Sequence, residues 1–169
     1  MKIDLSKTQE YLNWLSEKLF LDAKSDSAKN RVIKRGEVYW CHFGKGIGSE
    51  QGSTRPAVIL QYDIANLKSS NTIVAPITHT ERRFPTVVFV DDKYNDSGDK
   101  ILNGYALLGN IVCVSKSRLG DYITCLNKEE MEKVNMALID SVGLRHTFNK
   151  LENRLHDLEE KLKNIDKNK

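Results

Sequence analysis

The chain of 169 residues lacks several features that would assign it to a familiar class. No apolar run approaches the roughly 18 residues of a membrane-spanning helix. The first 30 residues mix acidic groups with lysines and have no apolar centre, so export through a secretory signal is not expected. Three cysteines, an odd number without CxxC spacing, argue against a disulfide framework and a zinc site. We expect a cytoplasmic protein with no membrane partner and with cysteines that are small buried hydrophobic residues.

Common catalytic motifs are also missing. The sequence contains no GxGxxG, no Walker loop, no HExxH and no GxSxG. The four histidines are dispersed, and none is paired at i, i+4 with a carboxylate nearby. The net charge of +3 is too small to identify a nucleic-acid-binding protein by itself. These absences predict a protein with no metal and no other cofactor, whose function depends on the local placement of a few side chains.

Helical periodicity marks both ends of the chain. Apolar residues at helical spacing over Ser6–Ala23 predict a helix, with Ser6 and Gln9 as a capping box, and a polar linker follows over Lys24–Arg31. We therefore expect a helical extension over residues 1–30. At the other end, seven apolar residues alternate in steps of four and three: Leu144, Phe148, Leu151, Leu155, Leu158, Leu162 and Ile165. This heptad pattern predicts a coiled-coil helix over residues 144–169, paired either with the N-terminal helix or with another subunit.

The segment between these helices, residues 31–143, has a different pattern. Short runs rich in β-branched and aromatic residues are bounded by turn residues, which predicts a small antiparallel barrel or a strongly curved sheet. A polar loop is expected over Asp91–Asn103 and a helix over Lys128–Val142. The predicted strands are Glu37–Phe43, Ala57–Gln61, Thr72–Ile77, Thr86–Val90, Ala106–Val114 and Tyr122–Thr124.

A polar, glycine-containing loop over Gly48–Pro56 leads into the second of these strands. Pro56 is tolerated at the first position of a strand, and it biases Arg55 towards an extended backbone. A guanidinium held in this way presents a planar fork of donors suited to a phosphate group. The simpler alternative is a loop closed by a surface salt bridge, and for an isolated Arg-Pro pair that alternative is favoured.

A second polar signal lies at the end of the third strand, where Thr78 is followed by His79. A hydroxyl group at a strand end can point out of the sheet towards a site. Adjacent strand residues point to opposite faces, so His79 is not expected on the face that Thr78 occupies. The simpler alternative for Thr78 is an ordinary β-branched strand residue.

In this order and spacing, the segments resemble the MazF/PemK toxins over about Val32–Leu144. The matching residues are Arg35–Tyr39, Gly48–Gly52, Arg55-Pro56, Gln61–Asp63 with Asn66, Thr72–Thr78, Lys116–Leu119 and the helix through Met131–Leu144. The chain departs from the family pattern at Gly109-Asn110-Ile111-Val112, where the family has Glu-Gln-Ile-Arg.

The resemblance implies an α+β fold, an SH3-like curved antiparallel β-barrel with packed helices, to which this chain adds its N-terminal helix and C-terminal heptad helix. It implies the toxin of a type II toxin–antitoxin system, a homodimer that binds a cognate protein antitoxin. The implied activity is metal-independent, sequence-specific cleavage of single-stranded RNA, such as mRNA, through 2′-hydroxyl attack. The products would carry 2′,3′-cyclic phosphate and 5′-hydroxyl ends.

The resemblance also assigns site residues. Arg55 and Thr78 correspond to the catalytic pair, and Ser49, Glu50, Gln51 and Asn110 to positions that bind RNA. An arginine stabilises negative charge well but is a poor base, since it stays protonated. His79 and Glu50 are therefore weighed as candidates for proton transfer, and Tyr39, Trp40 and Phe43 as surfaces on which bases stack.

Two other functions remain open at this point. A gyrase-inhibiting toxin of the CcdB type has the same fold and cleaves nothing, although it has no need of Arg55 and Thr78. A catalytically silent RNA-binding or scaffold protein would account for the departures at Gly109, Asn110 and Val112 and for the C-terminal heptads.

Overall fold

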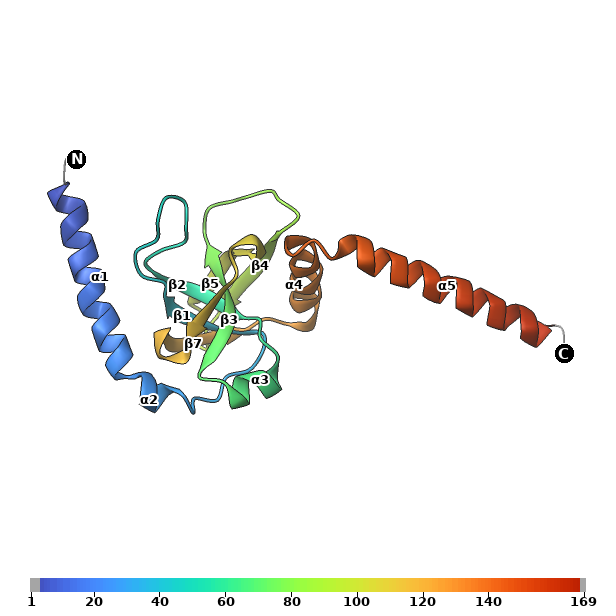
Figure 1. Ribbon diagram of the computed structural model, residues 1–169, viewed down its shortest axis with the longest axis horizontal. Coiled ribbons are helices and arrows are strands. Elements are labelled where there is room, and N and C mark those ends of the chain that lie inside the picture. The colour runs from blue at the N-terminus through green and yellow to red at the C-terminus, as the bar shows by residue number, and fades with distance from the viewer. Residues whose placement is uncertain (1–3, 168–169) are drawn as a thin grey trace.

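The computed structural model describes residues 4–167. Residues 1–3 and 168–169, the outer ends of the two predicted extensions, lie outside the described residues, as does the side chain of Ile165. A curled sheet forms the centre of the molecule, with long helices leaving it at opposite sides (Figure 1). The helices are α1 (Leu5–Ala23), α2 (Ser25–Ala28), α3 (Asp63–Lys68), α4 (Lys128–Ser141) and α5 (Arg145–Lys167). The strands are β1 (Glu37–His42), β2 (Thr54–Ile59), β3 (Asn71–Thr78), β4 (Val87–Tyr94), β5 (Lys100–Leu107), β6 (Val112–Ser115) and β7 (Leu119–Cys125).

The sheet is antiparallel, with the strand order β4-β5-β3-β2-β1-β7 and with β6 also paired to β3. It curls into a half-barrel, and apolar side chains form a core on each of its faces. One core includes Val58, Ala75 and Ile77 and is covered by α4 through Val134 and Ala137. The other core lies on the opposite face and contains Ile33, Tyr39, Cys41, Ala57, Ile59, Val74, Val114 and Leu119. The predicted α+β class with a curved antiparallel sheet is confirmed.

Two details of the predicted strands are wrong. The expected polar loop over Asp91–Asn103 is instead a hairpin of β4 and β5, closed by a short turn in which the Asn95 side chain accepts a hydrogen bond from the Asp99 backbone at 2.8 Å. The single strand expected over Ala106–Val114 is two strands, separated by the 3₁₀ turn η1 (Leu108–Asn110). The outer part of the hairpin is largely exposed, so burial imposes no alternation of apolar residues there.

Two further expectations are corrected. Asp4, rather than Ser6, caps α1: its carboxylate accepts from the backbone N–H groups of Ser6 and Lys7, and the helix begins at Leu5. Of the three cysteines, Cys41 is buried, as expected, whereas Cys113 and Cys125 are exposed. Both exposed cysteines lie in strands with one solvent-facing side, a placement that residue type alone does not reveal.

A buried lysine joins the linker after α2 to the sheet. Lys116 belongs to the 3₁₀ turn η2 (Lys116–Arg118) and is almost fully buried. Its ammonium donates to three backbone carbonyls, those of Lys29 at 3.4 Å, Arg31 at 2.9 Å and Asn66 at 2.5 Å. Burial lowers the pKa of Lys116. The three carbonyls satisfy the donors of a group that would otherwise be expensive to bury.

The N-terminus of α4 is fixed by a buried carboxylate. Glu130 forms a capping box with Asn127, and it also accepts from the Lys93 ammonium at 2.6 Å and from the Asp91 backbone N–H at 3.1 Å. Burial by itself raises the pKa of Glu130, but the hydrogen bonds from Lys93 and from the backbone outweigh it and hold the pKa below its usual value of 4.5. This single side chain therefore ties α4 to β4.

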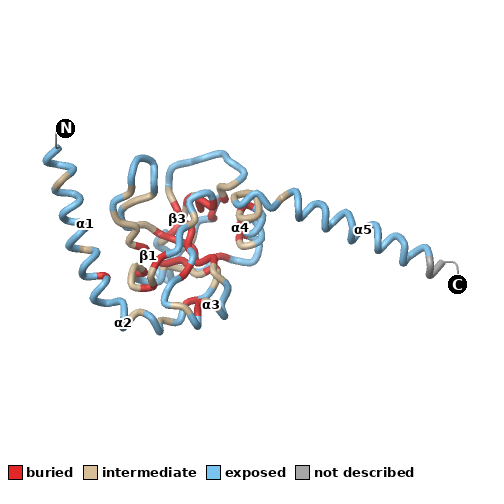
Figure 2. The backbone as a smooth tube through the Cα atoms, in the orientation of Figure 1, coloured by how far each residue is buried: buried red, intermediate tan, exposed pale blue. Residues whose placement is uncertain are grey.

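The last helix, α5, extends away from the sheet, and its residues from His146 to Asn164 are exposed (Figure 2). Its direction is set at the joint with α4, where Gly143 adopts a positive φ of 73°. Arg145 donates from Nε and Nη2 to the two carboxylate oxygens of Asp140, each at 2.7 Å. This contact holds the pKa of Asp140 below its usual range. Within the described residues, no helix combines the length and apolar content needed to cross a membrane.

We predict that Glu130→Gln lowers the free energy of unfolding at pH 7 by about 2–4 kcal/mol, because the Lys93 ammonium loses its charged partner in a buried setting. The folded-state pKa of Glu130 is depressed, so its contribution is complete above about pH 4.5 and is lost as the pH falls through the folded-state value. Urea denaturation at pH 7 and at pH 3 measures both effects.

Glu129→Gln is the matched control, because Glu129 is an exposed carboxylate in the same first turn of α4. This variant should stay within about 0.5 kcal/mol of the wild type. If Glu129→Gln and Glu130→Gln lose stability equally, or if the difference between them does not shrink at pH 3, the buried ion pair does not have this role.

Candidate functional site

The loop between β1 and β2 is closed by backbone hydrogen bonds at its base. Ser53 donates to the Gly44 carbonyl at 2.6 Å, and Phe43 donates to the Ser53 carbonyl at 3.0 Å. Gly52 lies so close to the Gly44 carbonyl that a Cβ there would be 2.9 Å from its oxygen. At the tip, the Glu50 carboxylate accepts from the Ile47 backbone N–H at 2.8 Å. The loop is therefore an ordered structure that delivers the chain to β2 in a fixed direction.

Arg55 lies near the start of β2 and is half-buried. Its Nε donates to the Gly52 carbonyl at 2.9 Å, and its Nη1 donates to Oε1 of Gln51 at 2.6 Å. Both acceptors belong to the loop that precedes the strand. The fork makes no other hydrogen bond to the described residues, so its remaining N–H groups are available to an anion. The surface salt bridge considered as the simpler alternative is absent among the described residues, and the guanidinium is instead oriented by neutral acceptors.

Thr78 is the last residue of β3 and is also half-buried. Strands β2 and β3 pair as Ala57 with Pro76 and Ile59 with Val74. Continuing this register by two positions sets Arg55 opposite Thr78, with both on the face that carries Ala57 and Val74. The Thr78 hydroxyl oxygen accepts from the Thr80 backbone N–H at 3.3 Å, which leaves its O–H free to donate.

A hollow of about 610 Å³ opens beside Gln51, the loop partner of Arg55, although neither Arg55 nor Thr78 is part of its wall. Three of the residues predicted to bind RNA, Glu50, Gln51 and Asn110, lie in its wall. The rest of the wall includes the aromatic ring of Phe43 and the arginine Arg118. Gln51 connects the hollow to the Arg55 guanidinium through its side-chain oxygen. The hollow therefore combines an aromatic face, two amides, a carboxylate and two cations, and Gln51 connects it to Arg55.

Other residues singled out in the sequence lie elsewhere. Ser49 is exposed at the loop tip and does not line the hollow. Tyr39 is buried in the second core, where its hydroxyl donates to Glu37 at 2.8 Å, so it offers no stacking surface. Trp40 is 42% exposed, but it lies on the face of β1 opposite to Tyr39 and Cys41 and so faces away from the Arg55 side of the sheet. His79 is exposed beyond the end of β3.

The N-terminal helix contacts the base of the β1–β2 loop, a contact that no pattern in the sequence indicated. Glu17 of α1 pairs with Nδ1 of His42 at 2.5 Å, and Glu10 pairs with Lys45. The ring of Trp14 lies against Gly44, where a Cβ would come within 2.2 Å of it. These contacts place α1 along the strand and loop that lead to Arg55.

Arg118 also contacts the base of the β1–β2 loop. Its Nη1 donates to the backbone carbonyls of His42 at 2.9 Å and Phe43 at 3.2 Å. Its guanidinium also lies 5.2 Å from the ring centre of Trp14, within the range of a cation–π contact. Arg118 therefore links the hollow, the base of the loop and α1.

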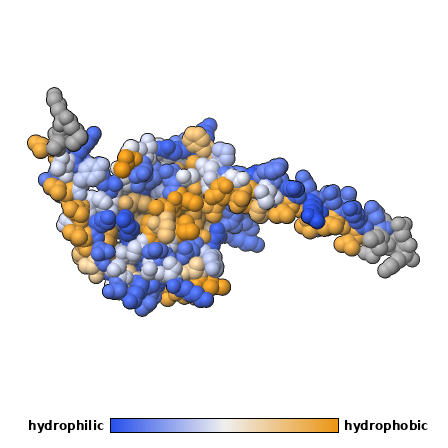
Figure 3. All heavy atoms as spheres, in the orientation of Figure 1, coloured by the Kyte–Doolittle hydropathy of each residue, from blue (hydrophilic) through white to orange (hydrophobic). Residues whose placement is uncertain are grey.

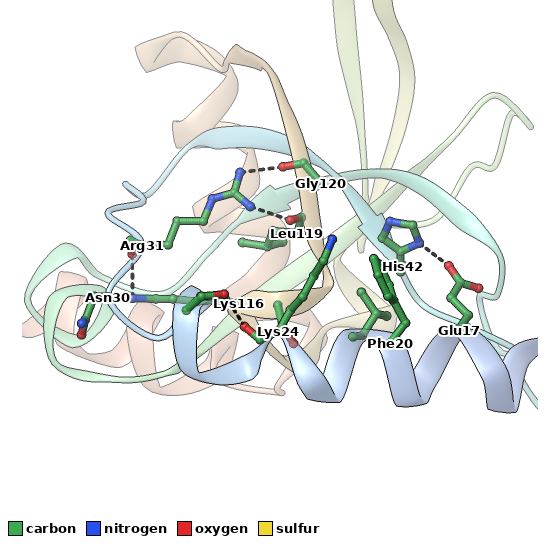
Figure 4. A pocket seen from close by; sticks show the side chains of 13 residues that line it. Glu17, Phe20, Lys24, Asn30, Arg31, His42, Lys116, Leu119 and Gly120 are labelled. Atoms are coloured by element: carbon green, nitrogen blue, oxygen red, sulfur yellow. Dashed lines mark hydrogen bonds and ion pairs between the residues drawn. The ribbon is translucent and has the colours of Figure 1, made fainter.

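A second hollow, of about 720 Å³, separates α1 and α2 from the sheet (Figure 4). Phe20 and Lys24 come from the helices, and His42 and Lys116 from the sheet side. Arg31 crosses one end of it, donating to the carbonyls of Leu119 and Gly120 at 2.5 and 2.6 Å. Leu21 is the buried residue of α1, so this helix docks mainly through its polar contacts and Trp14.

We predict that Gly44→Ala displaces α1 from the loop, because the new methyl group would occupy the position of the Trp14 ring. Hydrogen exchange of the α1 amides should become faster, and the melting temperature should fall. Gly48→Ala is the matched control: Gly48 also has a positive φ, of 60°, but no atom lies within 4 Å of its added Cβ. Unchanged protection of α1 in Gly44→Ala, or equal loss in both variants, would contradict the contact.

Comparison with known proteins gives consistent matches to the central region. A sequence profile for the PemK-like, MazF-like toxins of type II toxin–antitoxin systems matches residues 34–142. Endoribonuclease EndoA of Bacillus subtilis is 40% identical over 116 residues, which cover 67% of this chain and 97% of that protein. The matched region 34–142 leaves α1 and α5 outside it.

Solved structures agree with these sequence matches. An endoribonuclease from mycobacterial species is 27% identical with a TM-score of 0.56, covering 68% of this chain and 95% of that one. A mycobacterial endoribonuclease in complex with its cognate antitoxin is 29% identical, also with a TM-score of 0.56, covering 66% of this chain and 96% of that one.

Proposed function

The chain belongs to the PemK-like, MazF-like toxins of type II toxin–antitoxin systems and is an endoribonuclease, and we propose that it cleaves single-stranded RNA at a site formed by Arg55 and Thr78. The observation that carries this proposal is the orientation of Arg55. Its guanidinium is held by Gly52 and Gln51, opposite the position of Thr78 and next to a hollow lined by polar residues.

The proposed reaction uses the 2′-hydroxyl group of the substrate as the nucleophile. The 2′-oxygen forms a bond to phosphorus and loses its proton, while the bond from phosphorus to the 5′-oxygen breaks and that oxygen gains a proton. The products carry a 2′,3′-cyclic phosphate and a 5′-hydroxyl group. No metal is required by this scheme, because the extra negative charge on phosphorus is met by cationic and neutral donors of the protein.

Arg55 and Thr78 supply those donors. The N–H groups of Arg55 that are not bound to the loop face the developing negative charge, and their positions are fixed before the substrate arrives. The Thr78 hydroxyl, which accepts from Thr80, donates its own proton towards a non-bridging oxygen. Neither group is a base at neutral pH, so their contribution is electrostatic and orienting.

Selection of the RNA sequence is assigned to the neighbouring hollow. Glu50, Gln51 and Asn110 offer both donors and acceptors to the edges of an unpaired base, and Phe43 offers a ring on which the base stacks. Gln51 has two roles, because its side-chain oxygen also holds Arg55. Ser49, exposed at the loop tip, is assigned to the backbone of the bound strand.

The family assignment extends the proposal to partners. A mycobacterial endoribonuclease has been solved in complex with its cognate antitoxin, and we propose a cognate protein antitoxin for this chain as well. We also propose a homodimer, as the family resemblance implies. An enzyme of this class meets its mRNA substrate in the cytoplasm, which is the location we propose.

Arg55→Ala should lower the rate of RNA cleavage on the order of 10²–10³-fold in a buffer with EDTA, because the main stabiliser of transition-state charge is removed. The melting temperature should change by only about 2–4 °C, because Arg55 is half-buried and bonds only to its own loop. Arg55→Lys keeps the charge but not the fork and should recover only part of the rate. Cleavage by Arg55→Ala at the wild-type rate would overturn the site.

Thr78→Val should slow cleavage roughly 10–100-fold, since it removes a hydrogen-bond donor and keeps the shape of the side chain. Thr78→Ser, which restores the hydroxyl, should recover most of the lost rate. Both rates can be followed by the release of a fluorophore from a short RNA. Equal rates for the valine and serine variants would show that the hydroxyl has no part in the reaction.

The same assays separate this function from a gyrase-inhibiting or catalytically silent protein. Either alternative predicts no cleaved RNA at all, with or without Arg55. An enzyme of the proposed kind leaves products with cyclic phosphate and 5′-hydroxyl ends, which mass spectrometry of the fragments identifies. The geometry at Arg55 and its loop favours the enzyme, because an inhibitor of a protein target has no need of a prealigned guanidinium.

A further inference from the structure

The C-terminal helix α5 carries an apolar face that nothing in this chain covers over the described residues. Figure 3 shows this face as a continuous band along one side of the helix. Its members are 43–63% exposed: Leu144, Phe148, Leu151, Leu155, Leu158 and Leu162. Helices in proteins gain most of their stability from packing of such a face, so a projecting helix with this pattern is incomplete without a partner.

The N-terminal helix is not that partner within one chain. Helix α1 packs against α2 and η2 at one side of the sheet, and α5 leaves the sheet at the opposite side (Figure 1). The fork between Arg145 and Asp140 sets the direction of α5 away from the body. Of the two partners that the heptads allowed, the structure leaves a helix from outside the chain.

The charges beside the apolar face identify the partner. With Leu151 and Leu158 at d positions and Leu155 and Leu162 at a positions, the flanking e positions are acidic, Glu152 and Glu159. The flanking g positions are basic, Arg154 and Lys161. All four of these side chains are exposed. A helix with one acidic and one basic border is complementary to a second copy of itself.

The same charges select the orientation. In a parallel pair, each g residue faces the e residue five positions further along the partner helix, which sets Arg154 against Glu159 of the second copy. In an antiparallel pair, g faces g and e faces e, so basic borders would meet basic borders and acidic would meet acidic. We infer that α5 pairs with α5 of a second copy of this chain as a parallel, in-register coiled coil.

This association is separate from any contact between the sheets. Region 34–142, which carries the family match, ends before α5 begins. The α5 pair therefore adds an interface to the enzyme, whatever contacts the two catalytic regions make with each other.

Disulfide trapping in the full-length chain tests the parallel register. The background carries Cys113→Ser and Cys125→Ser, which remove the two exposed thiols. Leu162→Cys places a thiol at an a position and should form a covalent dimer rapidly under mild oxidation, because a–a′ residues face each other in a parallel pair. Asn153→Cys is the control at the outward f position and should cross-link at least tenfold more slowly. Equal rates for the two variants would overturn the proposal.

A mixture of chains distinguishes the two orientations. An antiparallel pair places a positions opposite d positions, so one centred between Leu155 and Leu158 would join Leu151 to Leu162. When Leu151→Cys and Leu162→Cys chains are mixed and oxidised, the parallel pair predicts disulfides between like positions and almost none between 151 and 162. A predominant 151–162 product would show an antiparallel pair. No product of either kind would show that something else covers the face, and both results overturn the proposal.

Charge reversal tests the border residues. Glu152→Lys/Glu159→Lys makes both borders basic, and Arg154→Glu/Lys161→Glu makes both acidic. In the Leu162→Cys background, each variant alone should form the covalent dimer roughly tenfold more slowly than its parent. Mixing the two should restore the rate and give the mixed dimer. If the charge reversals leave the rate of covalent dimer formation unchanged, the assignment of a second copy as the partner is overturned.

Discussion

The antiparallel register between β2 and β3 determines where Arg55 and Thr78, the proposed catalytic pair, lie. Pairing of Ala57 with Pro76 and of Ile59 with Val74 sets the ends of both strands together. A shift by one residue would turn Arg55 and Thr78 towards the core under α4 and bring the second core's apolar residues out of contact. The two buried cores, one on each face, hold this register in place. Burial on both sides of one strand pair thus fixes the geometry of the site that lies at its end.

Much of this arrangement could be predicted from the sequence. Pro56 indicated an extended backbone at Arg55, which β2 has. Strand alternation predicted different faces for Thr78 and His79, whereas β3 ends at Thr78 and His79 is exposed beyond it. The apolar face of α5 could be predicted because its spacing is regular over three heptads. In each case the information is local, and a few neighbouring residues determine the backbone direction.

What the sequence could not predict depends on contacts between distant segments. The hydrogen bond from Arg55 to Gln51 needs the loop to be closed by Gly44 and Ser53, which no spacing rule encodes. Most of strand β5 was missed because Asn103 and Gly104 interrupt its apolar residues, although burial alternates along the folded strand. The docking of Trp14 on Gly44 joins an extension to a loop 30 residues away. Such contacts emerge only once the fold has brought the segments together.

The buried ammonium of Lys116 sets a limit on how far the catalytic unit can be trimmed. Two of its three acceptors, the carbonyls of Lys29 and Arg31, precede residue 34, where the family match begins. A shortened chain starting at that residue would keep the sheet but would leave the Lys116 ammonium with the Asn66 carbonyl as its one remaining acceptor among these three. The smallest self-sufficient version of the enzyme therefore starts at or before Lys29, a few residues earlier than homology alone would place it.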